Sequence, residues 1–294
     1  MATRAARMIG MSIALAAALA VPAFAQSASA AEKPVRLPVP AGPTLPTLFL
    51  IGDSTVRNGS GDGANGQWGW GEPLAGFFDS TRIKMVNCAR GGRSSRTYLT
   101  EGLWDSVLEM LKPGDFVMMQ FGHNDEGPLD DTARARGTLK GIGDETQEID
   151  NPITKKHEVV HTYGWYLRKF IADARAKGAT PIVCTLIPRK KWAEGKIARN
   201  KLDYAGWAAD VAEAEKAPLV DLNEIVARRY DELGPDQVEP LFADPHTHTS
   251  RAGAELNAEC VVAGLKGLAS NPLAAYFSEK AKGVAPESRD TLAP

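Results

Sequence analysis

Five short apolar runs recur along the chain and are separated by more polar segments. They are TLFLIGDS (47–54), IKMVNCA (83–89), DFVMMQFG (115–122), TPIVCTLIP (180–188) and PLVDL (218–222). A continuous apolar run of this length is typical of a strand that is buried on both faces. The five runs therefore predict about five strands of a parallel sheet.

Segments with helical spacing of apolar residues lie between these runs and after the last one. They are residues 71–78, 103–111, 162–178, 204–216, 223–233 and 250–268. Lys177 and Gly178 are typical of a helix end placed just before a buried strand. Strands and helices that alternate in this way indicate βαβ units, and hence an α/β domain with helices on both faces of the sheet.

The N-terminus has the pattern of a secretory signal peptide. Arg4 and Arg7 precede an apolar run over residues 8–21, which is too short to span a bilayer comfortably, and Ala23-Phe24-Ala25 offers small residues for cleavage. We therefore expect a signal peptide over 1–25, a Pro-rich linker over 26–46, a catalytic domain over 47–268 and a C-terminal tail over 269–294. The tail shows no clear periodicity, so we expect little order there.

Charge and cysteine content narrow the range of functions. The chain has 34 Lys and Arg against 36 Asp and Glu, a formal net charge of −2, which gives no global field that attracts nucleic acid or anionic membranes. Cys88, Cys184 and Cys260 are widely spaced and allow one bridge at most, which excludes a disulfide-rich scaffold. We expect all three to be buried and inert.

Reactive residue types follow several of the predicted strands. Ligands of a parallel α/β sheet bind outside the carboxyl ends of the strands. Ser54 follows the first run, Gly91-Gly92 the second and Asn124 the third, while FADPHTHTS before the last helical segment supplies Asp244 and His248. A nucleophile, a base with a nearby carboxylate and neutral donors for an oxyanion are what acyl transfer requires.

Four blocks of this sequence resemble those of a known family. IGDSTV, NCARGGRSSRTY, FGHND and HTHTSRAGAE are similar to the signature blocks of SGNH (GDSL-type) hydrolases, and more narrowly of the rhamnogalacturonan acetylesterase family. The resemblance covers about Thr47 to Leu268. It implies a flavodoxin-like three-layer α/β fold and an enzyme without metal or cofactor that hydrolyses acetyl esters of a pectic polysaccharide.

The resemblance also implies roles for individual residues. Ser54 matches the nucleophile and His248 the general base. Gly92, Asn124 and the backbone N–H of Ser54 match the donors of the oxyanion hole.

One position departs from the family pattern, which places its acid three residues before the histidine. Pro245 stands there, and Asp244 lies four residues before His248. Either the loop has one extra residue and Asp244 still reaches His248, or a Ser–His pair works with a backbone carbonyl. We favour Asp244, because loss of the orienting carboxylate costs orders of magnitude in rate. His246 is a second, less well aligned candidate for the base.

Aromatic and basic residues near these blocks are candidate substrate contacts. Trp68 and Trp70 follow the nucleophile, and indole rings stack on sugars, although they also serve as core residues. Arg90 and Arg93, together with Arg96, form a basic cluster beside Gly92. These arginines would either pair with the carboxylates of a galacturonate polymer, or be solvated or paired with acidic residues of the protein itself.

A competing signal is His157-Glu158-Val159-Val160-His161, which matches the H-E-x-x-H motif of zinc proteases. A catalytic zinc site needs this motif on a helix and a third protein ligand. Thr162 is a plausible N-cap for the helical segment that follows, which places the histidines on the entry loop or first turn, and no third ligand stands out. We therefore expect no metal site.

The sequence thus predicts an exported serine carbohydrate esterase that acts on an acetylated polysaccharide or oligosaccharide. Its partners would include no nucleic acid, and no membrane span would remain after signal cleavage. Two alternatives remain: a zinc metalloprotease, and a non-catalytic carbohydrate-binding protein on a degenerate hydrolase scaffold, for which Pro245 is the support.

Overall fold

The computed structural model describes residues 1–2, 36–42 and 44–287. The fold described below belongs to the unit formed by residues 36–294. The predicted cleavage site, nearly all of the predicted signal peptide and half of the predicted linker lie outside the described residues.

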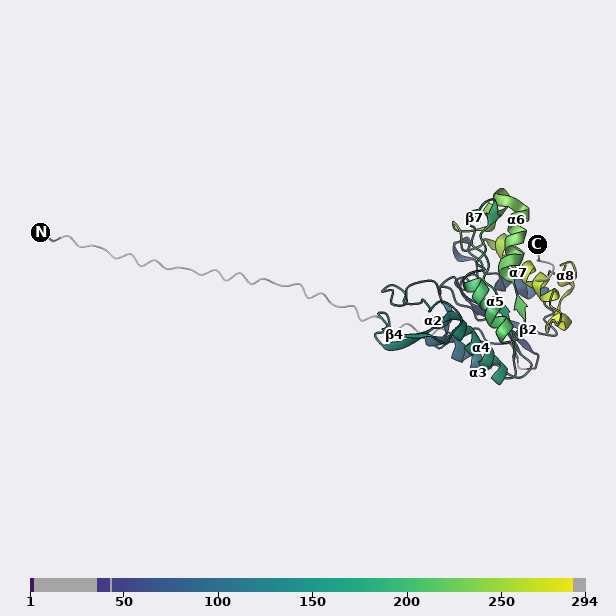
Figure 1. The fold of residues 1–294 in the computed structure, drawn as a ribbon, viewed down its shortest axis with the longest axis horizontal. Coiled ribbons are helices and arrows are strands. Elements are labelled where there is room, and N and C mark those ends of the chain that lie inside the picture. Colours follow the sequence, from purple (N-terminus) through teal and green to yellow (C-terminus); the bar gives the residue numbers. More distant parts are fainter. Residues whose placement is uncertain (3–35, 43, 288–294) are drawn as a thin grey trace. The chain divides into compact units, whose positions relative to one another are not determined.

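A five-stranded parallel sheet forms the centre of this unit, as predicted. Its strands are β1 (Thr47–Gly52), β2 (Lys84–Asn87), β3 (Phe116–Gln120), β6 (Thr180–Cys184) and β9 (Leu219–Val220). Their spatial order is β2-β1-β3-β6-β9, with every pair parallel. Figure 1 shows the ribbon of the fold, in which the edge strand β2 is labelled. This order is that of flavodoxin-like doubly wound sheets, whose topological switch point lies between β1 and β3.

Helices cover both faces of the sheet, which gives the predicted three-layer α/β fold. On one face α2 (Ser95–Thr100), α3 (Leu103–Met110), α4 (Tyr163–Ala176) and α5 (Tyr204–Ala214) contact one another in succession. On the other face α7 (Arg251–Lys266) contacts α1 (Gly71–Leu74) and α6 (Leu222–Val238). Short 3-10 turns lie at Ala64–Gly66, Ala75–Phe77, Glu239–Leu241 and Ala274–Tyr276.

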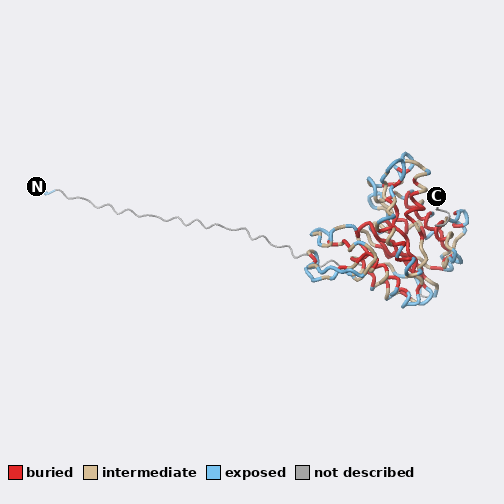
Figure 2. The backbone as a smooth tube through the Cα atoms, viewed as in Figure 1, coloured by how far each residue is buried: buried red, intermediate tan, exposed pale blue. Residues whose placement is uncertain are grey.

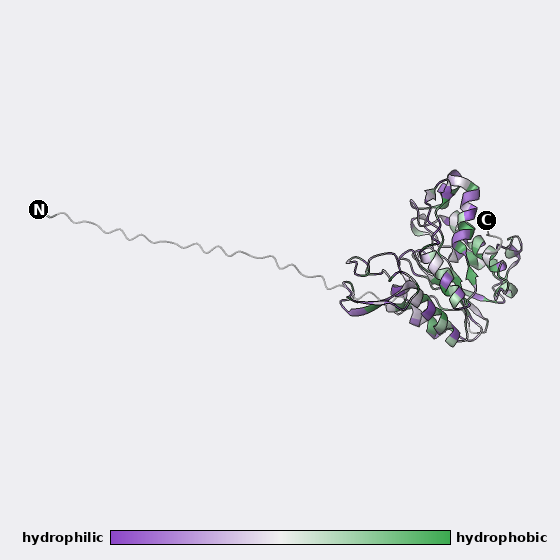
Figure 3. Ribbon diagram, viewed as in Figure 1, coloured by the Kyte–Doolittle hydropathy of each residue, from purple (hydrophilic) through white to green (hydrophobic). Residues whose placement is uncertain are grey.

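The core has two layers because side chains alternate across each strand. Leu48, Leu50 and Met118 belong to the cluster that packs under α1, α6 and α7. On the opposite face aromatic rings fill the space, and the rings of Trp104 and Phe170 lie 5.0 Å apart. Figure 2 shows buried residues in the interior of the fold. Figure 3 shows that hydrophilic residues collect on the outer parts, notably on the hairpin that Figure 1 labels β4.

Two small hairpins were not predicted. Strands β4 (Thr146–Asp150) and β5 (His157–His161) pair antiparallel with each other and not with the central sheet. Strands β7 (Trp192–Ala193) and β8 (Lys196–Ile197) form the other hairpin. The prediction that His157 and His161 lie on an entry loop or first helical turn was therefore wrong, although α4 does begin after Thr162, whose hydroxyl accepts from the N–H of Trp165.

The C-terminal segment is more ordered than predicted up to its last described residue. It includes α8 (Glu279–Lys282), and Leu273 and Ala281 belong to the core cluster. Phe277 forms a β-bridge with Phe78 and packs its ring 5.4 Å from it. Residues 288–294 lie outside the described range.

All three cysteines are free and buried, as predicted. Burial raises the pKa of Cys88 and Cys260 to about 12, so these thiols stay protonated. No helix in the described part of the chain combines the length and apolar character needed to cross a bilayer.

Candidate active site

Ser54 lies in the turn that directly follows β1, at the carboxyl edge of the sheet. The carbonyl of Asp53 accepts from the N–H groups of Val56 and Arg57 at 3.2 and 3.1 Å, which closes the turn. The Asp53 carboxylate accepts from the N–H and hydroxyl of Thr55 at 2.8 and 2.7 Å. Gly52 is required before this turn, because a Cβ there would lie 2.5 Å from the carbonyl oxygen of Gln120 on β3.

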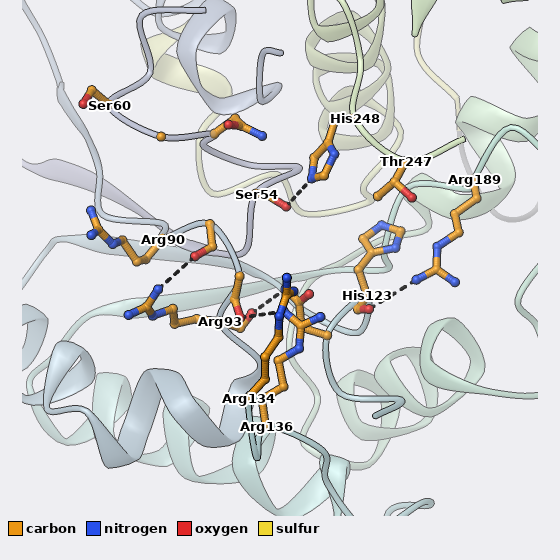
Figure 4. A pocket seen from close by; sticks show the side chains of 15 residues that line it. Ser54, Ser60, Arg90, Arg93, His123, Arg134, Arg136, Arg189, Thr247 and His248 are labelled. Carbon is orange, nitrogen blue, oxygen red and sulfur yellow. Dashed lines mark hydrogen bonds between the residues drawn. The ribbon is translucent and has the colours of Figure 1, made fainter. Parts of the chain in front are cut away.

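His248 contacts both Ser54 and Asp244 through its two ring nitrogens. The Oγ of Ser54 lies 2.9 Å from Nε2 of His248, and Nδ1 of His248 lies 2.5 Å from Oδ2 of Asp244 (the first contact is drawn in Figure 4). A serine within hydrogen-bond reach of an imidazole that a carboxylate orients is the arrangement of an activated nucleophile. The described geometry thus matches the prediction in which Asp244 reaches His248 despite the extra residue.

The extra residue, Pro245, is accommodated by a tight loop around the carboxylate. Oδ1 of Asp244 accepts from the backbone N–H groups of His246, Thr247 and His248 at 3.0, 2.7 and 3.0 Å. Partial burial raises the pKa of Asp244, but the hydrogen bonds from Thr247, His248 and His246 outweigh burial and bring it to about 2. The carboxylate is therefore ionised and fixed. His246 is exposed on the same loop, and its Nδ1 contacts the hydroxyl of Thr247 instead of Ser54.

Two loops bring the expected oxyanion donors to the same edge. Gly92 has a φ of 78°, a left-handed conformation that favours glycine, and its carbonyl accepts from Nη1 of Arg136 at 2.9 Å. Nδ2 of Asn124 donates to the carbonyl of Arg93 at 2.9 Å, which leaves its second N–H for a ligand. Both residues line the same cavity as Ser54.

Asp125 ties the Asn124 loop to the start of α2. Its buried carboxylate accepts from the N–H and hydroxyl of Ser95 at 3.0 and 2.5 Å, and from the N–H of Gly122 at 3.0 Å. Burial raises the pKa of Asp125 to about 7 although these hydrogen bonds oppose the shift. Asp125 thus holds the backbone of the loop in place.

A cavity of about 630 Å³ opens in front of Ser54 and is rich in arginine (Figure 4). It contains no aspartate or glutamate among its lining residues. The lining residues come from the loops after four strands and from the catalytic loop: Ser54, Asn58, Gly59, Ser60, Arg90, Gly91, Gly92, Arg93, His123, Asn124, Arg134, Arg136, Arg189, Thr247 and His248.

His123 lines the cavity as a neutral imidazole. Its side chain is buried, and neither ring nitrogen has a partner among the described residues. Burial lowers its pKa to about 4, and the nearby positive charge of Arg189 adds to the shift although Asp53 opposes it. A buried imidazole with neither nitrogen paired is a costly arrangement, since buried polar atoms are normally hydrogen-bonded.

Among the predicted substrate contacts, Arg90 and Arg93 line the cavity, and the tryptophans do not. Trp70 is fully buried and donates to Oε1 of Gln120 at 2.9 Å, so the prediction that it contacts substrate was wrong. The ring of Trp68 lies under the guanidinium of Arg251 at 5.3 Å and is not among the lining residues. Both indoles follow the nucleophile in sequence, but their rings contact other parts of the protein and not the cavity.

The H-E-x-x-H segment lacks the geometry of a zinc protease. It forms strand β5, not a helix. Glu158 pairs with Arg96, while His157 lies 3.7 and 3.5 Å from Glu148 and Asp150 on the hairpin. His161 stacks on Trp165 with ring centroids 3.7 Å apart. Among the described residues, no group of three or more His, Cys, Asp or Glu side chains is arranged to hold a metal ion.

Several cavity residues were missed at the level of sequence. Arg189 follows β6, so the rule that ligands bind at the carboxyl ends of strands would have indicated it. Arg134 and Arg136 lie in the loop between β3 and β4, where no periodic pattern marks them. Thr247 lies between the two histidines of the catalytic loop.

Taken together, the fold and the Ser–His–Asp geometry are those of a serine-dependent acyl hydrolase on a doubly wound sheet. A family model described as the GDSL-like lipase/acylhydrolase family matches residues 50–256. The chain therefore belongs to this family, which makes it a carboxylic ester hydrolase.

Individual relatives agree with this assignment. A rhamnogalacturonan acetylesterase of Emericella nidulans is 32% identical over 72% of this chain and 82% of its own length. The rhamnogalacturonan acetylesterase RhgT of Bacillus subtilis is 28% identical over 75% of this chain and 90% of its own.

Solved structures share the fold. The crystal structure of YxiM from Bacillus subtilis has a TM-score of 0.61 and 27% identity, and covers 76% of this chain. The matched part is 56% of that protein. An acetylxylan esterase of Geobacillus stearothermophilus, Axe2, has a TM-score of 0.50 and 18% identity, and the match covers 74% of this chain and 93% of that protein. This similarity concerns the fold alone.

Proposed function

We propose that this protein is a carbohydrate acetylesterase that removes O-acetyl groups through an acetyl-serine intermediate. The observation that carries the proposal is the relay from Ser54 through His248 to Asp244, set at the mouth of an open polar cavity. The similarity to two rhamnogalacturonan acetylesterases supports acetylated glycan as the substrate class.

The proposed reaction has two half-reactions. Nε2 of His248 takes the proton of Ser54 as Oγ attacks the acetyl carbonyl carbon, and Asp244 stabilises the resulting imidazolium. The N–H groups of Ser54 and Gly92 and the side-chain amide of Asn124 receive the charge that develops on the carbonyl oxygen. The imidazolium then gives its proton to the departing sugar hydroxyl, and water hydrolyses the acetyl-enzyme in the same manner.

A pectic polysaccharide of the rhamnogalacturonan type is the substrate that we propose within this class. The names of the relatives support this choice, and an arginine-rich cavity suits a polymer that contains galacturonate. We also propose that the protein is exported, on the signal-like pattern of residues 1–25.

The test is acetate release from acetylated rhamnogalacturonan, acetylxylan and a chromogenic acetyl ester. We expect Ser54→Ala to abolish acetate release from all three substrates, while the far-UV circular dichroism spectrum and the melting temperature stay unchanged. A fluorophosphonate probe should label the wild-type protein and not the variant. Full turnover by a folded Ser54→Ala protein would refute the proposal, and absence of labelling in the wild type would favour a non-catalytic binding protein.

A further inference from the structure

The catalytic cavity concentrates positive charge that the rest of the chain does not share. Five arginines line it, namely Arg90, Arg93, Arg134, Arg136 and Arg189, and no carboxylate does. The whole chain has a formal net charge of −2, so this concentration is local and not a consequence of composition. Local charge of one sign in a concave site attracts ligands of the opposite sign.

Three of the five arginines already have partners within the protein. Arg136 donates to the carbonyl of Gly92 at 2.9 Å. Arg93 donates to Glu101 at 2.8 Å and to the carbonyl of Gly91 at 3.2 Å. Arg189 donates to the carbonyl of His123 at 3.2 Å and lies 3.5 Å from Glu126. Through these contacts the three side chains stabilise the loops around the site.

Arg90 and Arg134 differ, because their side chains make no hydrogen bond or ion pair to any residue that the structure describes. Arg90 is half-buried and Arg134 is exposed, so both guanidinium groups are accessible from the cavity. Burial lowers the pKa of Arg136, and the positive charge of the neighbouring Arg134 lowers it further. Two cations that line the cavity of Ser54 thus have no hydrogen-bond or ion-pair partner among the described residues.

The two arginines belong to different loops. Arg90 follows β2, and Arg134 lies between β3 and β4; Figure 4 shows them at separate places around Ser54. A glycan whose acetyl group lies at Ser54 could therefore contact a guanidinium in two different directions. Such an arrangement suits a polymer with repeated charges.

We propose that Arg90 and Arg134 are binding subsites for anionic groups of the glycan, so that the site selects acetyl groups on a chain that carries repeated negative charge. This inference rests on the proposed esterase function. A guanidinium pairs with the two oxygens of an oxyanion in bidentate fashion. Glycans carry such groups as uronate carboxylates or as sulfate esters, and both share this chemistry.

The experiment compares matched substrates with matched variants. The substrates are acetylated oligogalacturonate, the same material after its carboxyl groups have been reduced to neutral alcohols, an acetylated sulfated galactan and a chromogenic acetyl ester. The variants are Arg90→Gln, Arg134→Gln and the double variant. Arg82→Gln is the control, because Arg82 is an exposed arginine before β2, at the opposite edge of the sheet.

We expect each single variant to lose about three- to tenfold in kcat/KM on the acidic substrate, mainly through KM, since uniform binding is removed. The double variant should lose roughly the product of the two factors. The neutral substrate, the chromogenic ester and the Arg82→Gln control should be unaffected. High salt should reduce the wild-type preference for the acidic substrate.

The outcomes separate the two proposals. Equal loss on charged and neutral substrates, or no loss on any, would overturn the arginine subsites while leaving the esterase function intact. Absence of Ser54-dependent acetate release from every substrate would overturn the function itself. A preference for the sulfated over the uronate glycan that both arginines mediate would keep the subsites and assign them to sulfate.

Discussion

The guanidinium of Arg96 and the carboxylate of Glu158 form a bidentate pair, with Nε–Oε1 and Nη2–Oε2 distances of 2.7 and 2.8 Å. Arg96 is fully buried, and its Nη1 also donates to the carbonyls of Leu129 and Gly137 at 2.9 and 2.8 Å. Glu158, the glutamate of the H-E-x-x-H motif, thus neutralises the buried guanidinium of Arg96. That guanidinium in turn holds the loop that bears Arg134 and Arg136.

Replacement of Glu158 by Gln should destabilise the protein by about 3 kcal/mol, because it leaves the buried charge of Arg96 without its counter-ion. Urea unfolding at neutral pH would measure the change. His157→Ala, on the same strand but largely exposed, is the matched control and should change the free energy of unfolding by less than about 0.5 kcal/mol. If His157→Ala instead abolished activity and released bound zinc, the segment would be a metal site.

The Asp244→Asn variant should lose about 10²- to 10⁴-fold in kcat with little change in KM, because the imidazole of His248 loses the carboxylate that orients it and stabilises its charge. The backbone donors of the loop can still bond the amide oxygen, so the loop should keep its shape. His246→Ala is the control and should retain nearly full turnover. The opposite pattern would make His246 the base.

Asn124→Ala should lower kcat about 10²- to 10³-fold, since it removes one donor to the developing oxyanion. Ser60→Ala provides the comparison, because Ser60 lines the same cavity at a distance from the reacting groups in Figure 4. Steady-state kinetics on the chromogenic acetyl ester would measure both. A loss confined to KM for Asn124→Ala would indicate a substrate contact in place of an oxyanion donor.

His123 should make stability depend on pH in a defined window. Its pKa is about 4 in the folded protein, below the ordinary value near 6.5. The unfolded chain therefore binds more protons between these values, so the contribution of His123 is fully present above pH 6.5 and is lost as the pH falls to 4. The free energy of unfolding of the wild type relative to His123→Phe should fall by about 3 kcal/mol over that window.

The ionisation of Asp125 changes the free energy of unfolding in the opposite direction as the pH rises. Its pKa of about 7 lies above that of an unfolded aspartate, so its contribution is present at low pH and is lost as the pH rises through 7. Both proteins in the comparison contain Asp125, so the difference between their unfolding free energies isolates His123. Parallel curves for the two proteins from pH 7 to 4 would show that His123 does not titrate as stated.

The sheet was predictable because burial on both faces leaves continuous apolar runs, as in Leu48 to Ile51. The hairpin of β4 and β5 was not, because its strands pair only with each other and most of β4 is exposed. Its histidines are four apart in sequence, a spacing that places two side chains on the same face of a helix and equally of a strand.

Within the site, Ser54, Asn124 and His248 were predictable because each follows a strand or precedes a helix at the edge where ligands bind. Trp70 was misassigned because its position in sequence does not reveal that its ring turns inward to Gln120. Arg134 was missed because the loop that presents it depends on Arg96, more than thirty residues earlier, and such long-range dependence leaves no local pattern.

The carboxylate of Asp244 accepts hydrogen bonds from the backbone N–H groups of three consecutive residues, His246, Thr247 and His248. Five consecutive residues, 244–248, therefore position the acid and the base relative to each other. Of the three residues Ser54, His248 and Asp244, only the serine comes from another part of the fold. A shift of α7 would move acid and base together and lengthen the contact with Ser54 while the His–Asp contact persisted. The segment therefore holds its acid–base pair through its own local hydrogen bonds, and only the position of Ser54 relative to His248 depends on the rest of the fold.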